Sequence, residues 1–150
     1  MWKRISAFVS IIIFCCIVGG CKSSEHSSTT FEKATVAAQK VIDAVNDNSP
    51  SVLYDMLSKD LQQMISKSDY INNAIKERSN PYLTPLDLYL NEISLNRDES
   101  AEVVCLVASR LPGEMYKFSL IKEDGVYKAI IFKDVVDGSF INKFDTIVKW

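Results

Sequence analysis

Residues 115–133, MYKFSLIKEDGVYKAIIFK, decide the fold class of this 150-residue chain. Apolar residues alternate with polar ones on both sides of Asp124-Gly125, which is the pattern of two strands that each bury one face. An Asp-Gly pair between two such runs favours a two-residue turn whose central residues both have positive φ. The stretch therefore predicts an antiparallel hairpin with strands at 115–122 and 126–133.

Another strand, residues 86–95, is expected upstream of this hairpin. Its leucines alternate with polar residues as far as Leu90, but Ile93 falls on the opposite parity. An extra residue in one strand of an antiparallel pair restores the alternation. The pattern therefore predicts a β-bulge near Asn91 or Glu92.

Residues 102–109 form the most apolar of the four expected strands, so we place this strand inside the sheet. Polar turns at 96–100 and 111–114 join it to its neighbours. Cys105 lies in an apolar run of this strand, where Cys is typical of a small buried hydrophobic residue. A reactive or metal-binding thiol would need a nearby cation or a second ligand, and the surrounding sequence offers neither.

A long first helix is expected to open the folded domain. Thr29 and Glu32 have the spacing of a capping box, in which the two side chains satisfy backbone N–H groups at the start of a helix. Small and aliphatic residues then recur with a helical period from Ala34 to Val45. The polar, Ser/Thr-rich stretch 22–30 is interpreted as a flexible tether.

Two further helical segments follow. Ser49 and Pro50 predict the start of a helix, with Ser as the N-cap and Pro in the first turn, and Val52 is expected on its buried side. The third segment, residues 59–78, contains Ser68 as the expected cap of a fresh turn.

Helices followed by a run of antiparallel strands predict the α+β class. We expect three N-terminal helices packed on one face of a four-stranded antiparallel sheet, in a single domain formed by residues 31–150. The spacing of Ile141, Phe144 and Val148 favours a short C-terminal helix over a strand in residues 140–150.

The first twenty residues have the three parts of a secretory signal peptide. Lys3 and Arg4 form a basic start, residues 5–18 form an apolar stretch, and Gly19-Gly20 is an exit of small residues. The apolar stretch is shorter than the roughly 20 residues of a membrane-spanning helix. A cleaved signal peptide is therefore favoured over a permanent span.

Residues 18–21, VGGC, resemble the lipobox of bacterial lipoproteins. The resemblance implies that signal peptide 1–20 is cleaved, that the Cys21 thiol takes a diacylglycerol, and that the new amino terminus is acylated. Two or three acyl chains anchor a protein stably to a membrane. Lys22 implies delivery to the outer membrane, facing the periplasm, if the host has two membranes, and otherwise the outer face of the cell membrane. The alternative is an ordinary signal peptide with a coincidental thiol at Cys21.

The remaining chain resembles the cystatin-like and NTF2-like fold of small lipoproteins. The resemblance is carried by the helix through 34–38, the Asn-Asp-Asn break at 46–48, the helix through 53–58 and the strand at 125–130. It implies a sheet that rolls around the helices and leaves a conical pocket. It also implies a ligand-binding or protein-binding module more often than an enzyme.

Residue counts bear on several functional classes. The single His, His26, lies in the tether, so the expected domain has no imidazole base, Ser-His nucleophile or His zinc ligand. The 17 Lys+Arg against 19 Asp+Glu give a net charge of −2, which provides no electrostatic basis for a nucleic-acid partner. We therefore expect no nucleic acid, no metal and no cofactor other than the covalent lipid on Cys21.

Carboxylates and aromatic residues near the sheet are the candidates for a pocket. Asp55, Asp87 and Glu92 are candidate acids or bases that would act with a tyrosine, as in isomerases of this fold. The aromatic side chains have the more common alternative role of filling the core. The pocket candidates are Asp55, Asp87, Tyr89, Tyr116, Phe118 and Tyr127.

The sequence supports three functional hypotheses. The first is a non-enzymatic, lipid-anchored extracytoplasmic module that binds a protein or a small apolar ligand. The second is a small envelope enzyme that uses a pocket Asp with a Tyr. The third is an immunity-type or exclusion-type lipoprotein that occupies a protein partner at the membrane. The first is favoured because the anchor signal is present and no catalytic constellation is evident.

Overall fold

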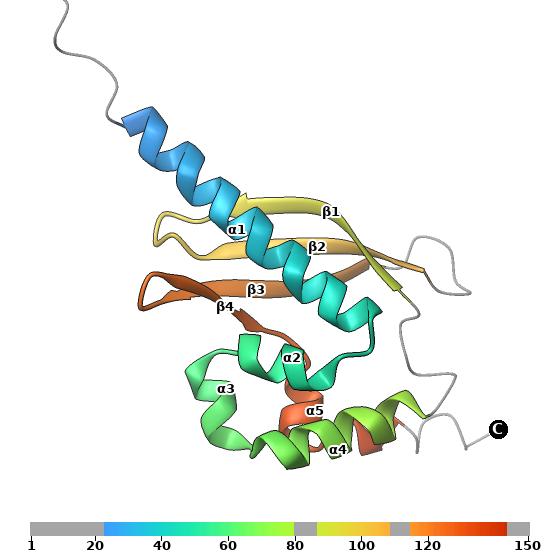
Figure 1. Cartoon of the computed structure of the whole chain (residues 1–150). Coiled ribbons are helices and arrows are strands. Elements are labelled where there is room, and N and C mark those ends of the chain that lie inside the picture. Colours follow the sequence, from blue (N-terminus) through green and yellow to red (C-terminus); the bar gives the residue numbers. More distant parts are fainter. Residues whose placement is uncertain (1–22, 80–86, 109–114, 144–150) are drawn as a thin grey trace, which may run out of the picture.

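A four-stranded antiparallel sheet carries the core of the α+β fold (Figure 1). The structure is a computed structural model, and it describes residues 23–79, 87–108 and 115–143. The four strands lie in chain order, which short hairpin connections between antiparallel strands produce. They are β1 (Asp87–Leu95), β2 (Ala101–Ala108), β3 (Met115–Glu123) and β4 (Val126–Ile130).

The β3–β4 hairpin has the predicted turn but a shorter second strand. Asp124 and Gly125 have φ angles of 50° and 81°, the positive pair that the two-residue turn requires. β4 ends at Ile130, and the chain then passes through Phe132, whose φ is 49°, into α5 (Lys133–Asp137). The predicted extension of the strand to residue 133 is therefore wrong, because α5 turns away to pack against α3 and α4.

The bulge predicted in β1 is confirmed. Leu90 pairs with Cys105 and Glu92 pairs with Val104, so Asn91 is the extra residue of β1. The buried position of β2 is also confirmed, because β2 has a hydrogen-bonded neighbour on each side and the Cys105 side chain is fully buried.

The long helix α1 (Ser23–Asn46) crosses one face of the sheet (Figure 1). Its buried stripe agrees with the predicted helical period, and Ala34 and Ala38 are fully buried. The helix begins six residues before Thr29, so the capping-box prediction is wrong and the polar stretch from residue 23 extends the helix instead of forming a flexible tether. A helix can continue beyond the edge of the sheet that it covers. The polar composition of residues 23–28 gave no indication of this extension.

The end of α1 is fixed to the edge strand by one side chain. The Asn46 amide nitrogen donates to the carbonyl of Leu88 at 2.9 Å, and the Leu88 backbone N–H donates to Asn46 Oδ1 at 2.8 Å. The Asn-Asp-Asn break at 46–48 therefore marks both the end of the helix and its connection to β1.

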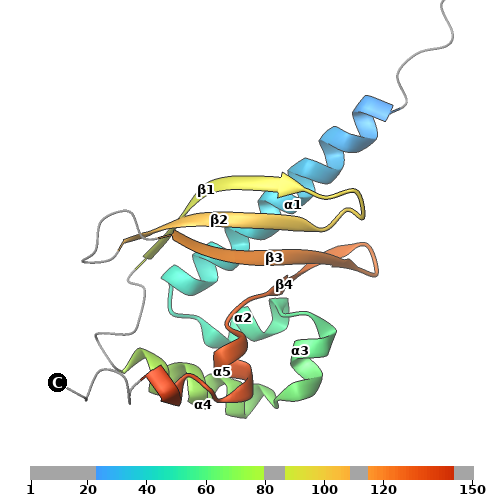
Figure 2. The same cartoon turned by 180° about the vertical axis from the view of Figure 1, so that it is seen from behind.

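The other helices gather beyond the β4 edge of the sheet (Figures 1 and 2). They are α2 (Pro50–Met56), α3 (Lys59–Met64), α4 (Lys67–Arg78) and α5. The Ser58 backbone N–H donates to the carbonyl of Ala129 at 2.9 Å, which joins this group to β4. The prediction that three helices pack on one sheet face is therefore wrong: α1 already occupies the face, and the shorter helices pack against one another instead.

Two serine caps divide the third predicted segment into α3 and α4. Ser58 Oγ accepts a hydrogen bond from the Leu61 backbone N–H, and Ser66 Oγ accepts one from the Asp69 backbone N–H at 3.1 Å. The predicted cap at Ser68 is therefore wrong by two residues, because Ser68 already lies within the first turn of α4. In α2, Ser49 and Pro50 occupy the predicted N-cap and first position, but the Ser49 side chain makes no capping hydrogen bond. The prediction that Val52 lies on the buried side of this helix is wrong, because Val52 is exposed.

Several predictions fall outside the described residues. The signal peptide, Cys21, Lys22 and the turn at 111–114 are among them. The C-terminal helix is covered in part, because residues 141–143 are helical and 144–150 are not described. None of the helices in the described part of the chain combines the length and apolar character that a membrane crossing requires.

Candidate functional site

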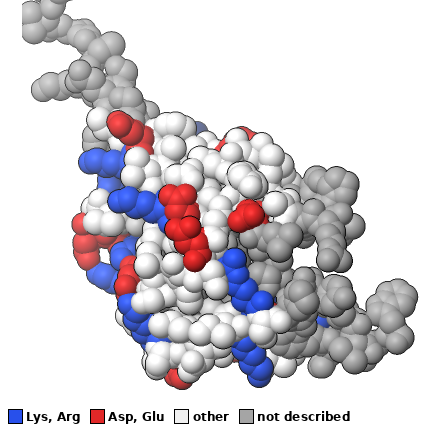
Figure 3. Space-filling view, turned by 45° about the vertical axis from the view of Figure 1, so that its right-hand side comes forward, with Lys and Arg blue, Asp and Glu red and all other residues white. Residues whose placement is uncertain are grey.

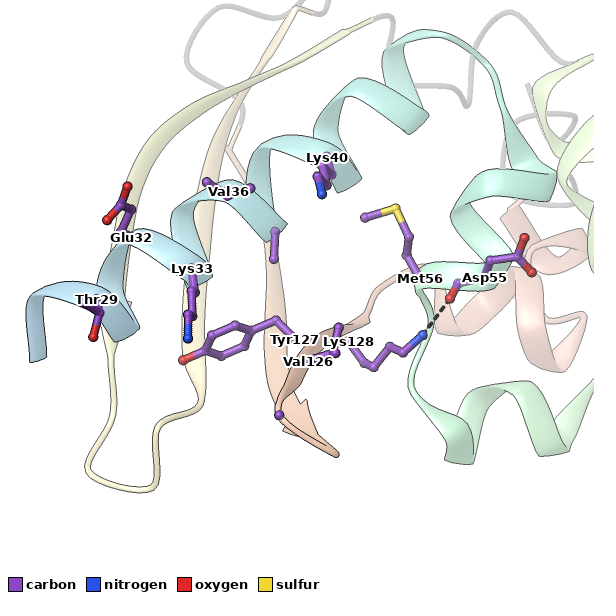
Figure 4. Close-up of a pocket in the computed structure, with 12 residues that line it drawn as sticks. Thr29, Glu32, Lys33, Val36, Lys40, Asp55, Met56, Val126, Tyr127 and Lys128 are labelled. Atoms are coloured by element: carbon purple, nitrogen blue, oxygen red, sulfur yellow. Dashed lines mark hydrogen bonds between the residues drawn. The ribbon is translucent and has the colours of Figure 1, made fainter. Parts of the chain in front are cut away.

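A cleft of about 620 Å³ lies between α1, the end of α2 and the start of β4 (Figure 4). This volume is within the range of about 300–1,000 Å³ that is typical of small-molecule sites. Lys33, Ala37 and Lys40 form the α1 wall because their spacing of four and three residues places them on one side of the helix. The opposite wall follows directly from the Asp124-Gly125 turn, which positions Val126 to Lys128.

The cleft has an apolar surface that the rest of the described protein leaves uncovered. Val36 and Val126 are 49% and 60% exposed, although both are large aliphatic residues. The Met56 side chain points from α2 toward the α1 wall (Figure 4). The Tyr127 ring is buried beneath α1, and its hydroxyl donates to the carbonyl of Glu99 at 2.9 Å. An apolar ligand in the cleft would therefore bury surface that is now exposed to water.

Three lysines line the same cleft, two from α1 and one from β4. Lys33 and Lys40 form no ion pair within the described residues. The Lys128 ammonium donates to the backbone carbonyl of Asp55 at 2.8 Å (Figure 4), and it forms no ion pair with a carboxylate of the described residues. The site therefore combines apolar surface with three lysines that no described carboxylate pairs with.

The lining of the cleft also contains two acidic residues, Glu32 and Asp55. Both oxygens of Asp55 accept hydrogen bonds from the Lys67 ammonium, at 2.7 and 2.6 Å. Glu32 lies on α1 one turn before Val36, and its carboxylate forms no ion pair within the described residues. On the face of the molecule shown in Figure 3, acidic and basic side chains are interspersed. Three lysines and two acidic residues line the cleft itself, and one of the two carboxylates is already paired with Lys67.

Two of the six pocket candidates, Asp55 and Tyr127, come together at this cleft. Their polar groups do not face each other, because the Asp55 carboxylate binds Lys67 and the Tyr127 hydroxyl binds the Glu99 carbonyl. The geometry therefore does not place this carboxylate and this hydroxyl as an acid and base around one substrate atom.

The other four candidates lie apart from the cleft. Asp87 and Tyr89 belong to the edge strand β1, where Tyr89 is 58% exposed on the opposite face from Leu88. Phe118 is buried in the core, and Tyr116 is half-buried with its ring centroid 5.4 Å from that of Phe132. The remaining candidates are therefore divided between the core and the outer face of the sheet.

The functional candidates that the sequence reasoning missed are the three cleft lysines. The spacing of Lys33, Ala37 and Lys40 beside the buried stripe of α1 was the available signal. Lys128 offered no signal, because it meets α1 only through the fold.

A second cluster of titratable side chains joins α4, α5 and the segment after α5. The Lys143 ammonium lies 3.0 Å from a Glu77 carboxylate oxygen and also pairs with Asp134. Burial raises the pKa of Glu77, although Lys143 partly offsets this. Burial also raises the pKa of the nearby Tyr116 to about 12. Tyr116 and Asp134 also border a second cleft, of about 400 Å³, beside β3 and the start of α5, but Glu77 and Lys143 do not line it. The contact between Glu77 and Lys143 is therefore that of a structural ion pair between helices.

The described residues offer few other reactive groups. Cys105 is a free thiol, and burial raises its pKa to about 11, which agrees with the predicted role as a small buried hydrophobic residue. No group of three His, Cys, Asp or Glu side chains in the described ranges is placed to hold a metal ion. No protein-family model matches the chain, and a search of curated proteins finds no significant similarity.

Proposed function

We propose that this protein is a non-enzymatic, lipid-anchored binding module on the extracytoplasmic side of a bacterial envelope, and that the cleft between α1, α2 and β4 binds a small apolar ligand. The observation that carries the proposal is the open cleft of about 620 Å³ with its exposed Val36 and Val126. Exposed aliphatic side chains at a concave site are typical of ligand binding.

The anchor is proposed from the VGGC sequence at 18–21. α1 begins at Ser23, two residues after Cys21, so an acylated Cys21 would hold the start of this helix next to the lipid headgroups. Thr29, at the near end of the cleft, follows six residues later, or about 9 Å along a helix. The cleft would therefore open close to the membrane surface.

The anchor is tested by the mass of the amino-terminal peptide after the full chain is expressed in a bacterium supplied with labelled fatty acid. The proposal expects an acylated peptide that begins at Cys21, and a Cys21→Ser variant that carries no label. An unlabelled peptide that begins elsewhere would contradict the anchor and leave a secreted domain.

The cleft is tested with a neutral fluorescent naphthylamine probe and two matched variants. Val36→Glu places a carboxylate in the apolar wall, whereas Val52→Glu makes the same change at a valine that is 52% exposed on α2 and does not line the cleft. We expect the first variant to lose most of the probe fluorescence and the second to retain it. Equal binding by both variants would place the probe elsewhere and contradict the proposal.

One observation favours occupation of a protein partner as a second candidate function. Tyr89, Leu106 and Met115 are direct cross-strand neighbours on the outer face of the sheet, and they are 58%, 43% and 48% exposed. No described helix covers this face (Figure 2). A photo-reactive residue at position 117 of the full chain should then crosslink one discrete protein in cells, and Leu106→Glu should abolish that product. Crosslinking that is unchanged by Leu106→Glu would exclude this role for Tyr89, Leu106 and Met115.

A further inference from the structure

The lysines of the cleft differ in their partners from most other lysines of the described chain. Five described lysines form ion pairs with carboxylates: Lys59, Lys67, Lys117, Lys122 and Lys143. Lys33, Lys40 and Lys128 form none within the described ranges, although they converge on one cleft. An anionic group that entered the cleft would therefore meet ammonium groups that form no ion pair with a described carboxylate.

The cleft lysines lie around the apolar surface of the cleft. Lys33 and Lys40 are seven residues apart, or about 10 Å along the helix, with Val36 and Ala37 between them. Lysine has a flexible four-carbon stem, so ammonium groups from both walls can approach one anionic group. The apolar surface continues from this point to Met56 on α2, where a hydrocarbon chain would replace water.

Neither half of the site explains ligand binding by itself. Exposed ammonium groups hold a small inorganic anion weakly, because water and salt screen the charge. A hydrocarbon chain gains about fourfold in affinity for each methylene group that it buries. A ligand that carries both groups uses the whole site.

We propose that the cleft binds a single-chain anionic amphiphile, with its head group at Lys33, Lys40 and Lys128 and its acyl chain along Val36 and Met56. The inference rests on the proposed function and adds the chemical class of the ligand. A carboxylate and a phosphate head share the required negative charge. Such a ligand partitions into membranes. With the proposed anchor in place, the cleft would lie close to the membrane surface and would take the ligand directly from it.

The test uses the full chain held by its own amino terminus in nanodiscs of neutral phosphatidylcholine. The probes are a diazirine-bearing palmitate and the fatty alcohol of the same chain, so that an ionised carboxylate head is compared with a neutral hydroxyl head. After irradiation, mass spectrometry measures how much of each probe is attached to the peptides that contain residues 29–40 and 126–128. We expect palmitate to label these peptides at least about tenfold more than the alcohol, since more than one ammonium group attracts the head.

Matched lysine variants test the role of the charges. Lys33→Gln and Lys40→Gln should each reduce palmitate labelling by about fivefold, the effect of a partly exposed charge pair. Lys76→Gln is the control, because Lys76 is an exposed helical lysine without an ion pair in the described residues and lies outside the cleft. All three positions tolerate glutamine in a helix, so circular dichroism should show unchanged folding.

The possible results separate this inference from the proposed function. Equal labelling of the cleft by palmitate and the alcohol, unaffected by the lysine variants, would overturn the anionic ligand and leave an apolar ligand site. Labelling of the cleft by neither probe would overturn both proposals. If a lysophospholipid with a phosphate head competes with the palmitate probe for labelling of the cleft, the ligand class includes phosphate heads as well as carboxylates, and the inference is supported. If labelling requires nanodiscs of anionic phosphatidylglycerol, the lysines contact the bilayer surface and the inference is wrong.

Discussion

α1 buries a continuous apolar stripe in the core, whereas α4 buries one large side chain and depends on polar contacts. The buried residue of α4 is Tyr70. The other attachments of α4 include hydrogen bonds from Asn73 to the Val135 carbonyl at 3.0 Å and from Arg78 to the Val45 carbonyl at 2.8 Å. The buried apolar residues of α1 are Ala34, Ala38, Val41, Ile42, Ala44 and Val45.

The difference indicates how each helix responds to change. Loss of a buried side chain from α1 leaves a cavity in close-packed core, and its neighbours cannot fill the space completely. Loss of a polar contact from α4 costs a hydrogen bond in a partly exposed position. We therefore expect α4 to open locally more often than α1, and the following four experiments test that distinction.

The largest effect is expected from Ile42→Ala in α1. Ile42 is 1% exposed, and truncation of a buried isoleucine costs about 2–5 kcal/mol. Ile75→Ala is the matched control, because Ile75 is 59% exposed on α4 and should change stability by less than about 0.5 kcal/mol. Urea unfolding measures both. Equal losses of unfolding free energy in the two variants would contradict the expected difference between the two helices.

A smaller loss of stability is expected from Arg78→Gln at the end of α4. The Arg78 guanidinium donates to a carbonyl in the last turn of α1, so its removal costs about 1–2 kcal/mol. Lys76→Gln changes a neighbouring exposed cation that has no such contact within the described residues, and it should leave stability nearly unchanged. Hydrogen exchange of the α4 amides, measured for both variants, should accelerate for Arg78→Gln alone. Acceleration spread evenly over α1 and the sheet would argue against a local attachment.

Asn73→Ala should have an effect of about 1 kcal/mol, because the lost hydrogen bond to the Val135 carbonyl is neutral and partly exposed. The adjacent Asn72 is exposed and provides the control variant Asn72→Ala. Chemical unfolding should separate the two variants. If both are equally stable, the link between α4 and α5 contributes nothing measurable.

The smallest effect is a change of pH dependence in Glu77→Gln. Burial raises the pKa of Glu77 above its ordinary value of 4.5. An acid with a raised pKa in the folded state stabilises the fold when protonated, so this contribution is present below pH 4.5 and is lost as the pH rises through the folded pKa. As the pH rises above 4.5, the free energy of unfolding should therefore fall less in Glu77→Gln than in the parent protein. Urea midpoints over this range, with Glu32→Gln as an exposed control, measure the difference; identical curves for Glu77→Gln and its parent would contradict it.

Local features of the sheet were predictable from the sequence. The positive φ angles at Asp124 and Gly125 and the bulge at Asn91 depend on neighbours within a few residues. The burial of Cys105 likewise depends on the apolar run that contains it. Turn chemistry and alternation are short-range properties, so these elements are encoded where they occur.

The arrangement of the helices was decided by the tertiary structure. An amphipathic pattern shows that a helix must bury one side, but it does not show which surface the helix covers. α1 occupies the inner face of the sheet, so α2, α3 and α4 pack beyond its edge with α5, a helix that the sequence pattern did not predict.

The candidate site divides in the same way. The sequence by itself contains the VGGC stretch from which the anchor is proposed, the spacing of Lys33 and Lys40 on one helix side, and the turn before Val126. Only the tertiary structure placed Lys128 beside α1 and turned the Asp55 carboxylate toward Lys67. The physical reason is that the charge and shape of a cleft depend on side chains from distant segments, whose proximity results from packing.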